Sequence, residues 1–457
     1  MAIEIWLPAL LGYLVPVGLF LVAWGGMEPQ RARRAATVGV LALSLAALGY
    51  FALGFGFHLG GARAVAERHG AAIDVKGLEG IYAVGEQGEW GLIGVTGFFL
   101  SGKDSNSGDS IPLTAEGLAL FVNYLPMVAT AVLLVVLSAY GSARGWQVAL
   151  GGLAVAMFLF PIMACWAWGG GWLANLGAQE TLARGHGFVD YAGSGVVYLL
   201  GGMAALGASV ALGQRNAPPG PGQPEEMPPS HFPLLANLGA MLFGLGLMSW
   251  SLSTPFHATG TGLNLPRAAV NLVLAGAGAI FTTQTYSWLA VGHADALMSA
   301  RGTVAGFVAA AASAPFVPPW AALLLGAVVG ILLPLGVYLM QHGLRLPDAT
   351  ATVAIGVTAG LVGLLAVAIF ADGLSGQGWN GVGLDEYRTE PNMGVVGFFP
   401  AERFNSDHGD GSGQLIAQLA GIGTISLFAF AAGWLTFAAL NLPYKRPWET
   451  SARSEQD

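Results

Sequence analysis

Long apolar stretches recur along the whole chain, and they constrain the fold more than any other feature. A stretch of roughly 20 apolar residues has the length that a helix needs to cross the hydrocarbon core of a bilayer. Only 10% of the 457 residues are charged and 54% are hydrophobic, a composition that is not typical of water-soluble domains. We therefore predict an all-α polytopic membrane protein with about eleven transmembrane helices, near residues 5–25, 36–57, 116–140, 146–168, 188–213, 232–254, 266–291, 298–316, 318–341, 348–371 and 413–441.

Charged residues beside the first apolar stretch predict the orientation of the chain. Glu4 precedes this stretch and no basic residue does, whereas Arg31, Arg33 and Arg34 follow it. Because basic residues favour the cytoplasmic side, we expect a retained first helix in the plasma (cytoplasmic) membrane, with the N-terminus outside and the C-terminus cytoplasmic. The expected organisation is a single transmembrane domain (1–441) with two long outer loops (58–112 and 372–412) and an inner Pro-rich linker (214–231), followed by a short cytosolic tail (442–457).

The Pro-rich linker leaves five apolar stretches before it and six after it, and two short sequences relate the halves. DYAGSGVVY places Asp190 eight residues before Tyr198, and DATATVAIG places Asp348 eight residues before Gly356. Each Asp is suited to cap a helix start, so we expect both to be structural helix caps. An odd number of spans per repeat makes the second copy inverted in the membrane. We predict a five-plus-five inverted repeat and a long final helix, with the two related helices meeting near the midplane.

At these residues the chain resembles the ammonium transporter and Rhesus (Amt/Rh) family. The resemblance lies in WGGGWLANLGAQ (168–179), VDYAGSGVVYLLGGMAALGASVALGQR (189–215), RGTVAGFVAAAASAPFVPPWAALLLGAVVG (301–330) and PDATATVAIGVTAGLVGLLAVAIFADG (347–373). It implies about eleven helices, an outside N-terminus and an inverted repeat. It also implies a homotrimer with one pore per subunit and ammonium/ammonia as the substrate.

The chain departs from this family at the centre of the pore. The resemblance assigns a hydrogen-bonded histidine pair to the positions that hold Tyr198 and Gly356 here, so the chain resembles a divergent member without the twin pore histidines. A phenol has a pKa near 10 and relays protons poorly compared with imidazole. Two interpretations stay open: Tyr198 is a polar waypoint in an open pore, or it fills the gap at Gly356 and plugs the pore, with its hydroxyl bonded to a buried carbonyl.

Other positions inherit expected roles from the resemblance. Trp168 matches the tryptophan of the outer substrate vestibule, although an interfacial aromatic belt is the alternative. Ser251 and Ser253 are candidates for the serine of that site, or else bond within the end of their own helix. Tyr124 and Val128 fall at the gate positions. The short tail argues against regulation by a nitrogen-signalling PII protein.

Two functions of different classes remain after the sequence is searched for chemistry. We find no nucleophile–base pair, no phosphate-cradling glycine loop, no His/Cys metal cluster and no basic–aromatic pattern for nucleic acid. We therefore expect no enzyme activity, no cofactor, no bound metal and no nucleic-acid partner. The first function is a transporter or channel for ammonium/ammonia or a similar small molecule. The alternative is a non-conducting relative that acts as an ammonium sensor or a structural, partner-binding membrane subunit.

Overall fold

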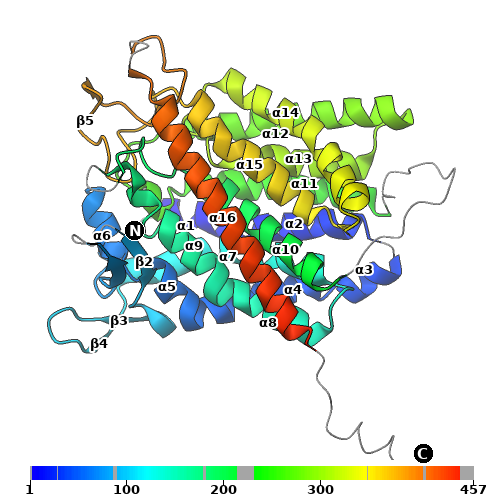
Figure 1. The fold of residues 1–457 in the computed structure, drawn as a ribbon, viewed down its shortest axis with the longest axis horizontal. Coiled ribbons are helices and arrows are strands. Elements are labelled where there is room, and N and C mark those ends of the chain that lie inside the picture. Colours follow the sequence, from blue (N-terminus) through cyan, green and yellow to red (C-terminus); the bar gives the residue numbers. More distant parts are fainter. Residues whose placement is uncertain are drawn as a thin grey trace, which may run out of the picture.

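The computed structural model describes residues 3–27, 29–85, 90–178, 182–213, 231–346, 348–404 and 408–442. It is predominantly helical, and the long helices run side by side in one bundle (Figure 1). Within the described residues, ten helical segments are long and apolar enough to cross a membrane: Leu7–Gly25, Val38–Leu59, Ala115–Ala139, Gly145–Ala167, Ser194–Ala211, Pro233–Leu252, Leu265–Val291, Pro319–Gly343, Thr352–Phe370 and Gly411–Leu440. The expected span near 298–316 is a shorter apolar helix, Ala296–Ala311. The prediction of an all-α polytopic membrane protein is confirmed.

Several spans consist of more than one helical segment, because prolines or wider π-type turns interrupt the α-helical hydrogen bonding. In chain order the helices before the Pro-rich linker are α1 (Ile3–Leu11), α2 (Leu14–Gly25), α3 (Pro29–Ala35), α4 (Val38–Gly49), η1 (Tyr50–Gly54), α5 (Phe55–Leu59), α6 (Ala62–Arg68), η2 (Phe98–Leu100), α7 (Ala115–Ala139), α8 (Gly145–Ala154), η3 (Val155–Leu159), α9 (Phe160–Ala167), η4 (Ala174–Gly177), η5 (Ser194–Leu199) and α10 (Leu200–Ala211). After it come α11 (Pro233–Leu252), η6 (Phe256–Ala258), α12 (Leu265–Val291), α13 (Ala296–Ala311), α14 (Pro319–Tyr338), η7 (Leu339–Gly343), α15 (Thr352–Phe370) and α16 (Gly411–Leu440).

The two long hydrophilic loops lie at the same end of the bundle as the N-terminus, whereas α16 runs across the bundle toward the other end (Figure 1). We call the end that carries the two long loops and the N-terminus the loop end. Where the structure describes them, the loops carry three small antiparallel sheets: β1 (Ile81–Val84) with β2 (Trp90–Gly94), β3 (Ser101–Lys103) with β4 (Ser110–Pro112), and β5 (Glu386–Tyr387) with β6 (Glu390–Pro391). These hairpins give the loops a defined structure that their Gly- and Asp-rich sequences do not reveal.

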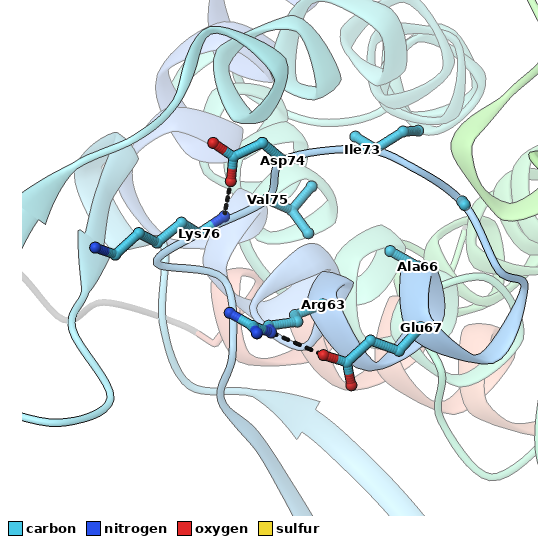
Figure 2. A pocket seen from close by; sticks show the side chains of 8 residues that line it. Arg63, Ala66, Glu67, Ile73, Asp74, Val75 and Lys76 are labelled. Atoms are coloured by element: carbon cyan, nitrogen blue, oxygen red, sulfur yellow. Dashed lines mark hydrogen bonds and ion pairs between the residues drawn. The ribbon is translucent and has the colours of Figure 1, made fainter.

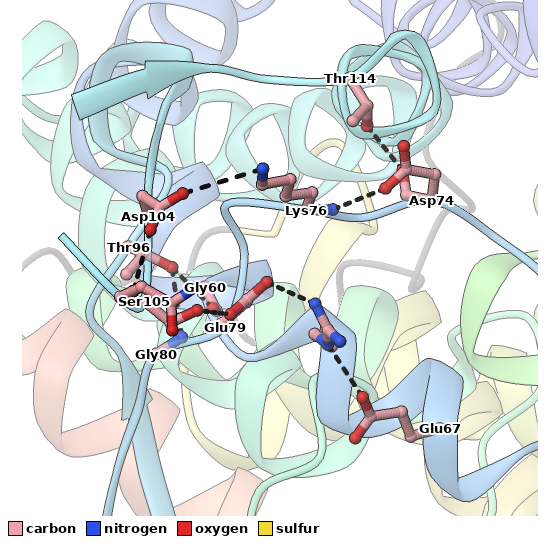
Figure 3. Close-up of polar contacts among 12 residues, drawn as sticks. Gly60, Glu67, Asp74, Lys76, Glu79, Gly80, Thr96, Asp104, Ser105 and Thr114 are labelled. Carbon is pink, nitrogen blue, oxygen red and sulfur yellow. Dashed lines mark hydrogen bonds and ion pairs between the residues drawn. The ribbon is translucent and has the colours of Figure 1, made fainter. Parts of the chain in front are cut away.

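Polar contacts fasten the first loop to itself and to α7. Arg63 of α6 bonds to Glu67 (2.9 Å) and to Glu79 (2.7 Å), and its side chain is half exposed. Figure 3 shows both glutamates in the network of polar contacts that also includes Asp74 and Thr114. The Thr114 hydroxyl, which caps α7, donates to the carbonyl of Asp74 (2.6 Å). Arg63, Glu67, Asp74 and Lys76 line a surface pocket of about 240 Å³ with charges of both signs (Figure 2). Exposed ion pairs of this kind contribute little stability singly, so the network orders the loop chiefly by its number of contacts.

Small residues let the helices of the two halves approach closely at the centre of the bundle. A Cβ added at Gly360 of α15 would lie 2.7 Å from the carbonyl oxygen of Ser194, and one added at Gly363 would lie 2.7 Å from the hydroxyl oxygen of the same serine. Such contacts leave no room for a side chain, and close packing through small residues is how helices associate in lipid. The segment η5–α10 therefore packs directly on α15, the helix to which the Asp-led sequence relates it.

Candidate functional site

Two buried carboxylates hold the starts of η5 and α15. Asp190 accepts hydrogen bonds from the backbone N–H groups of Gly193 (3.1 Å), Gly195 (3.0 Å) and Val196 (2.8 Å). Asp348 accepts from the N–H groups of Val353 (3.3 Å) and Ala354 (2.9 Å). The first N–H groups of a helix have no partner within the helix, and these carboxylates supply one. Burial raises the pKa of Asp190 to about 6, while its backbone hydrogen bonds act in the opposite direction.

Tyr198 lies about one turn into η5, the helical segment that follows Asp190, and it is fully buried. Its ring packs edge-on against Phe243 of α11, with centroids 5.9 Å apart. Its hydroxyl has no hydrogen-bond partner among the described residues, so the carbonyl bond expected for a plug is not formed. A buried hydroxyl without a partner is unfavourable by about 1–3 kcal/mol.

Gly356 touches the backbone of the opposite helix, not the Tyr198 ring. A Cβ at this position would lie 2.5 Å from the Tyr198 carbonyl oxygen and 2.9 Å from the Cα of Gly202. The Tyr198 ring therefore does not fill a gap beside Gly356, in contrast to one of the two interpretations of the sequence. The space that a side chain at 356 would need is occupied by main chain, so an imidazole has no room there while the helices keep this spacing.

Trp168 ends α9 near the loop end, and another ring covers its face. The indole Nε1 donates to the carbonyl of Asp190 (2.7 Å), and the side chain is buried. The imidazole of His257 stacks on it in parallel, with centroids 4.6 Å apart and an interplanar angle of 1°. Trp379, from the long loop 372–412, packs edge-on against His257, with ring centroids 6.0 Å apart.

Both nitrogens of His257 are hydrogen-bonded. Nε2 lies 2.9 Å from the carbonyl oxygen of Tyr191, and Nδ1 lies 2.8 Å from the hydroxyl of Tyr124. A carbonyl only accepts, so Nε2 carries the proton and Nδ1 accepts from the hydroxyl. Burial lowers the pKa of His257 to about 3. The ring on Trp168 is therefore neutral at pH 7.

A second buried histidine lies close by. His58 of α5 bonds through Nδ1 to the hydroxyl of Tyr50 (2.9 Å), and its ring stands edge-on to Tyr124 with centroids 4.8 Å apart. Its Nε2 has no partner among the described residues. The ring of Trp168 lies 6.3 Å away.

The remaining predicted site residues lie near Trp168, Tyr124 and the two histidines. Ser251 donates to the carbonyl of Leu247 (2.8 Å) and Ser253 to that of Trp250 (2.6 Å), so both hydroxyls donate within the end of their own helix. The Ser253 hydroxyl also accepts from the side-chain amide of Asn123 in α7 (3.1 Å). Val128 is buried in α7 one turn beyond Tyr124 and offers only an apolar surface.

The structure thus brings Trp168 and Tyr124 together, places Ser251 and Ser253 on the adjacent helix end, and sets Tyr198 and Gly356 at the helix–helix contact. The sequence alone does not assign His58 or His257 to the site, because His58 opens a long hydrophilic loop and His257 lies between two apolar stretches. The available signal was their apolar surroundings: FGFHL and PFHA each place a histidine among residues that favour burial.

Comparisons with known proteins identify the fold and the family. A sequence model of the Ammonium Transporter Family matches residues 5–451. Ammonium transporter Amt2 of Archaeoglobus fulgidus is 31% identical over 290 residues, covering 63% of this chain and 59% of that protein, and Amt1 of Haloferax mediterranei is 29% identical over 292 residues, covering 62% and 49%.

Solved structures share the fold over nearly the whole chain. One described as a sensor Amt protein superimposes with a TM-score of 0.71 at 21% identity, covering 96% of this chain and 92% of that one. Mep2 of Candida albicans also gives 0.71 at 21% identity, covering 96% and 83%. The chain belongs to the ammonium transporter family, as the resemblance in its sequence indicated.

Proposed function

We propose that this protein moves ammonium/ammonia, or a similar small molecule, across the membrane through a pore in each subunit. The observation that carries the proposal concerns two buried polar atoms that have no hydrogen-bond partner in the part of the chain that the structure describes. They are His58 Nε2 beside Trp168 and the Tyr198 hydroxyl at the helix–helix contact. Unmet hydrogen-bonding capacity in an apolar interior is unfavourable. A small molecule that donates or accepts hydrogen bonds would satisfy both atoms on its way through.

The rings of Tyr124, His58 and His257 around Trp168 suit such a substrate. A cation is attracted to the face of a tryptophan, and Trp168 is surrounded by tyrosine and imidazole groups that can hydrogen-bond an N–H donor. The chain spans only about half the length of the curated relatives that it matches. The substrate is therefore part of the proposal, and we infer it from the family. We extend the proposal to a homotrimer in the plasma (cytoplasmic) membrane, with both long loops outside and the C-terminal tail cytoplasmic. The charge distribution supports this orientation. We further propose that no enzyme activity or cofactor is involved.

Flux through reconstituted protein tests the proposal. Proteoliposomes containing a pH-sensitive dye are mixed with ammonium chloride, and the rate of the internal pH change is compared with that of protein-free liposomes. We expect a faster change with the native chain, and a slower one with Tyr198→Phe, which removes only the hydroxyl. A native rate equal to the protein-free rate would contradict transport.

One observation favours the alternative of a non-conducting ammonium sensor or structural subunit. Trp168 is only 2% exposed and Tyr198 is fully buried, so neither is reachable from outside in this conformation. Ammonium binding to a chain that gives no flux would support this alternative.

A further inference from the structure

The imidazole of His257 lies over the Trp168 ring, in the position that a bound cation would take. A cation bound to a tryptophan lies over the ring, within about 6 Å of its centroid. His257 holds this position on Trp168, parallel and 4.6 Å away. Ammonium and the imidazole therefore cannot occupy this face of the indole together.

The imidazole is held in place from several directions. Tyr124 donates to its Nδ1, Nε2 donates to the carbonyl of Tyr191, and Trp379 packs against it edge-on. The ring is neutral and both of its nitrogens are satisfied. It needs no ligand to be stable where it is, which distinguishes it from the unpartnered nitrogen of His58.

We propose that His257 is a built-in occupant of the substrate face of Trp168, so that ammonium binds there only when the imidazole ring is displaced. The inference rests on the proposed function, because it concerns access to the same site. His257 is then a specificity-determining residue: it lowers the apparent affinity by the fraction of time for which the face is covered. It also releases Tyr124 whenever it moves, which couples occupancy of Trp168 to the predicted gate position.

Binding of ammonium chloride to the purified full-length chain tests this, with calorimetric titration at constant ionic strength and sodium chloride as the control salt. Shortening the side chain uncovers the indole, so His257→Ala should lower the Kd by about tenfold or more. His257→Asn provides a second, more conservative variant and should show the same direction. Adding Trp168→Leu to His257→Ala should abolish the gain, because the uncovered face is then absent.

His186→Ala is the matched control. This histidine is also fully buried near the loop end, but it stacks on Tyr387, with centroids 4.0 Å apart, and not on Trp168. Its substitution should leave the Kd within about twofold of the native value. The inference is overturned if both His257 variants elute and melt like the native chain and bind ammonium no more tightly.

Flux measurements on the same proteins separate this inference from the proposed function. Tighter binding in both His257 variants without flux in any protein would uphold the covered site and refute transport. Native flux together with unchanged binding in the variants would uphold transport and refute the role of His257.

Discussion

Gly356→Ala is the smallest change that tests whether α15 and η5–α10 are in backbone contact. The added methyl would lie 2.5 Å from the Tyr198 carbonyl oxygen, and 2.9 Å and 3.1 Å from the Cα and N atoms of Gly202. All three are main-chain atoms, so no rotamer change relieves the clash. The helices would have to separate by close to 1 Å to restore ordinary contact distances.

The expected magnitude follows from two opposing effects. Overpacking a close contact typically destabilises by about 1–3 kcal/mol. Alanine favours the helix over glycine by up to about 1 kcal/mol. We therefore expect Gly356→Ala to lower the free energy of unfolding by about 1–2 kcal/mol. Gly423→Ala in α16 is the matched control, because a Cβ there has no neighbour within 4 Å. It should be neutral or stabilising by up to about 1 kcal/mol.

Reversible unfolding in mixed micelles with increasing dodecyl sulfate measures both variants against the native chain. Helix content gives the fraction folded. The reasoning is refuted if Gly356→Ala is as stable as Gly423→Ala. A clash of this size also predicts that Tyr198→His combined with Gly356→His does not restore a histidine pair, because the second imidazole has no space.

Two further predictions concern buried charge. Burial lowers the pKa of His186 from 6.5 to about 3, so its contribution to the stability of the fold is fully present above pH 6.5 and declines as the pH falls. Between pH 6.5 and about pH 5 the free energy of unfolding of the native chain should fall by about 2 kcal/mol more than that of His186→Gln. Unfolding at each pH measures this difference, and parallel curves for the two proteins would contradict it. Asp372→Asn should destabilise by about 3 kcal/mol, because it removes the carboxylate that balances the charge of the nearly buried Arg267 (2.5 Å) and leaves the guanidinium only the carbonyls of Val317 and Phe316. Asp104→Asn, at an exposed pair with Lys76, should cost about 1 kcal/mol or less, and equal effects of the two substitutions on the free energy of unfolding would refute the distinction.

The membrane-spanning architecture could be predicted from the sequence because the length of an apolar run is a local property. Ten of the expected spans recur as long helices within the described residues, and the remaining one is shorter because PFVPP follows it and ends the helix early. The hairpins of the long loops were not predicted, because their strands are only two to five residues long and lie among glycines and acidic residues.

The site was predicted only where one sequence segment carried its own signal. The Asp190 and Asp348 positions could be found because each Asp lies four residues before the start of the helix that it caps. His257 could not be assigned in this way, since its hydroxyl partner Tyr124 is 133 residues away and Trp168 lies on a third segment. The backbone contact at Gly356 was missed for the same reason: a missing side chain in the sequence does not show whether space or main chain lies beside it.

The claim that substrate passes Tyr198 can be tested most directly with a thiol at that position. Cys165 is the single cysteine of the chain, so Tyr198→Cys in a Cys165→Ala background carries one thiol. Silver ion, a monovalent cation that binds thiolates, is added while ammonium flux into proteoliposomes is recorded. The account predicts that silver stops flux in this variant and leaves flux in Cys165→Ala unchanged. Flux that continues unchanged in the Tyr198→Cys protein at saturating silver would contradict a path past Tyr198.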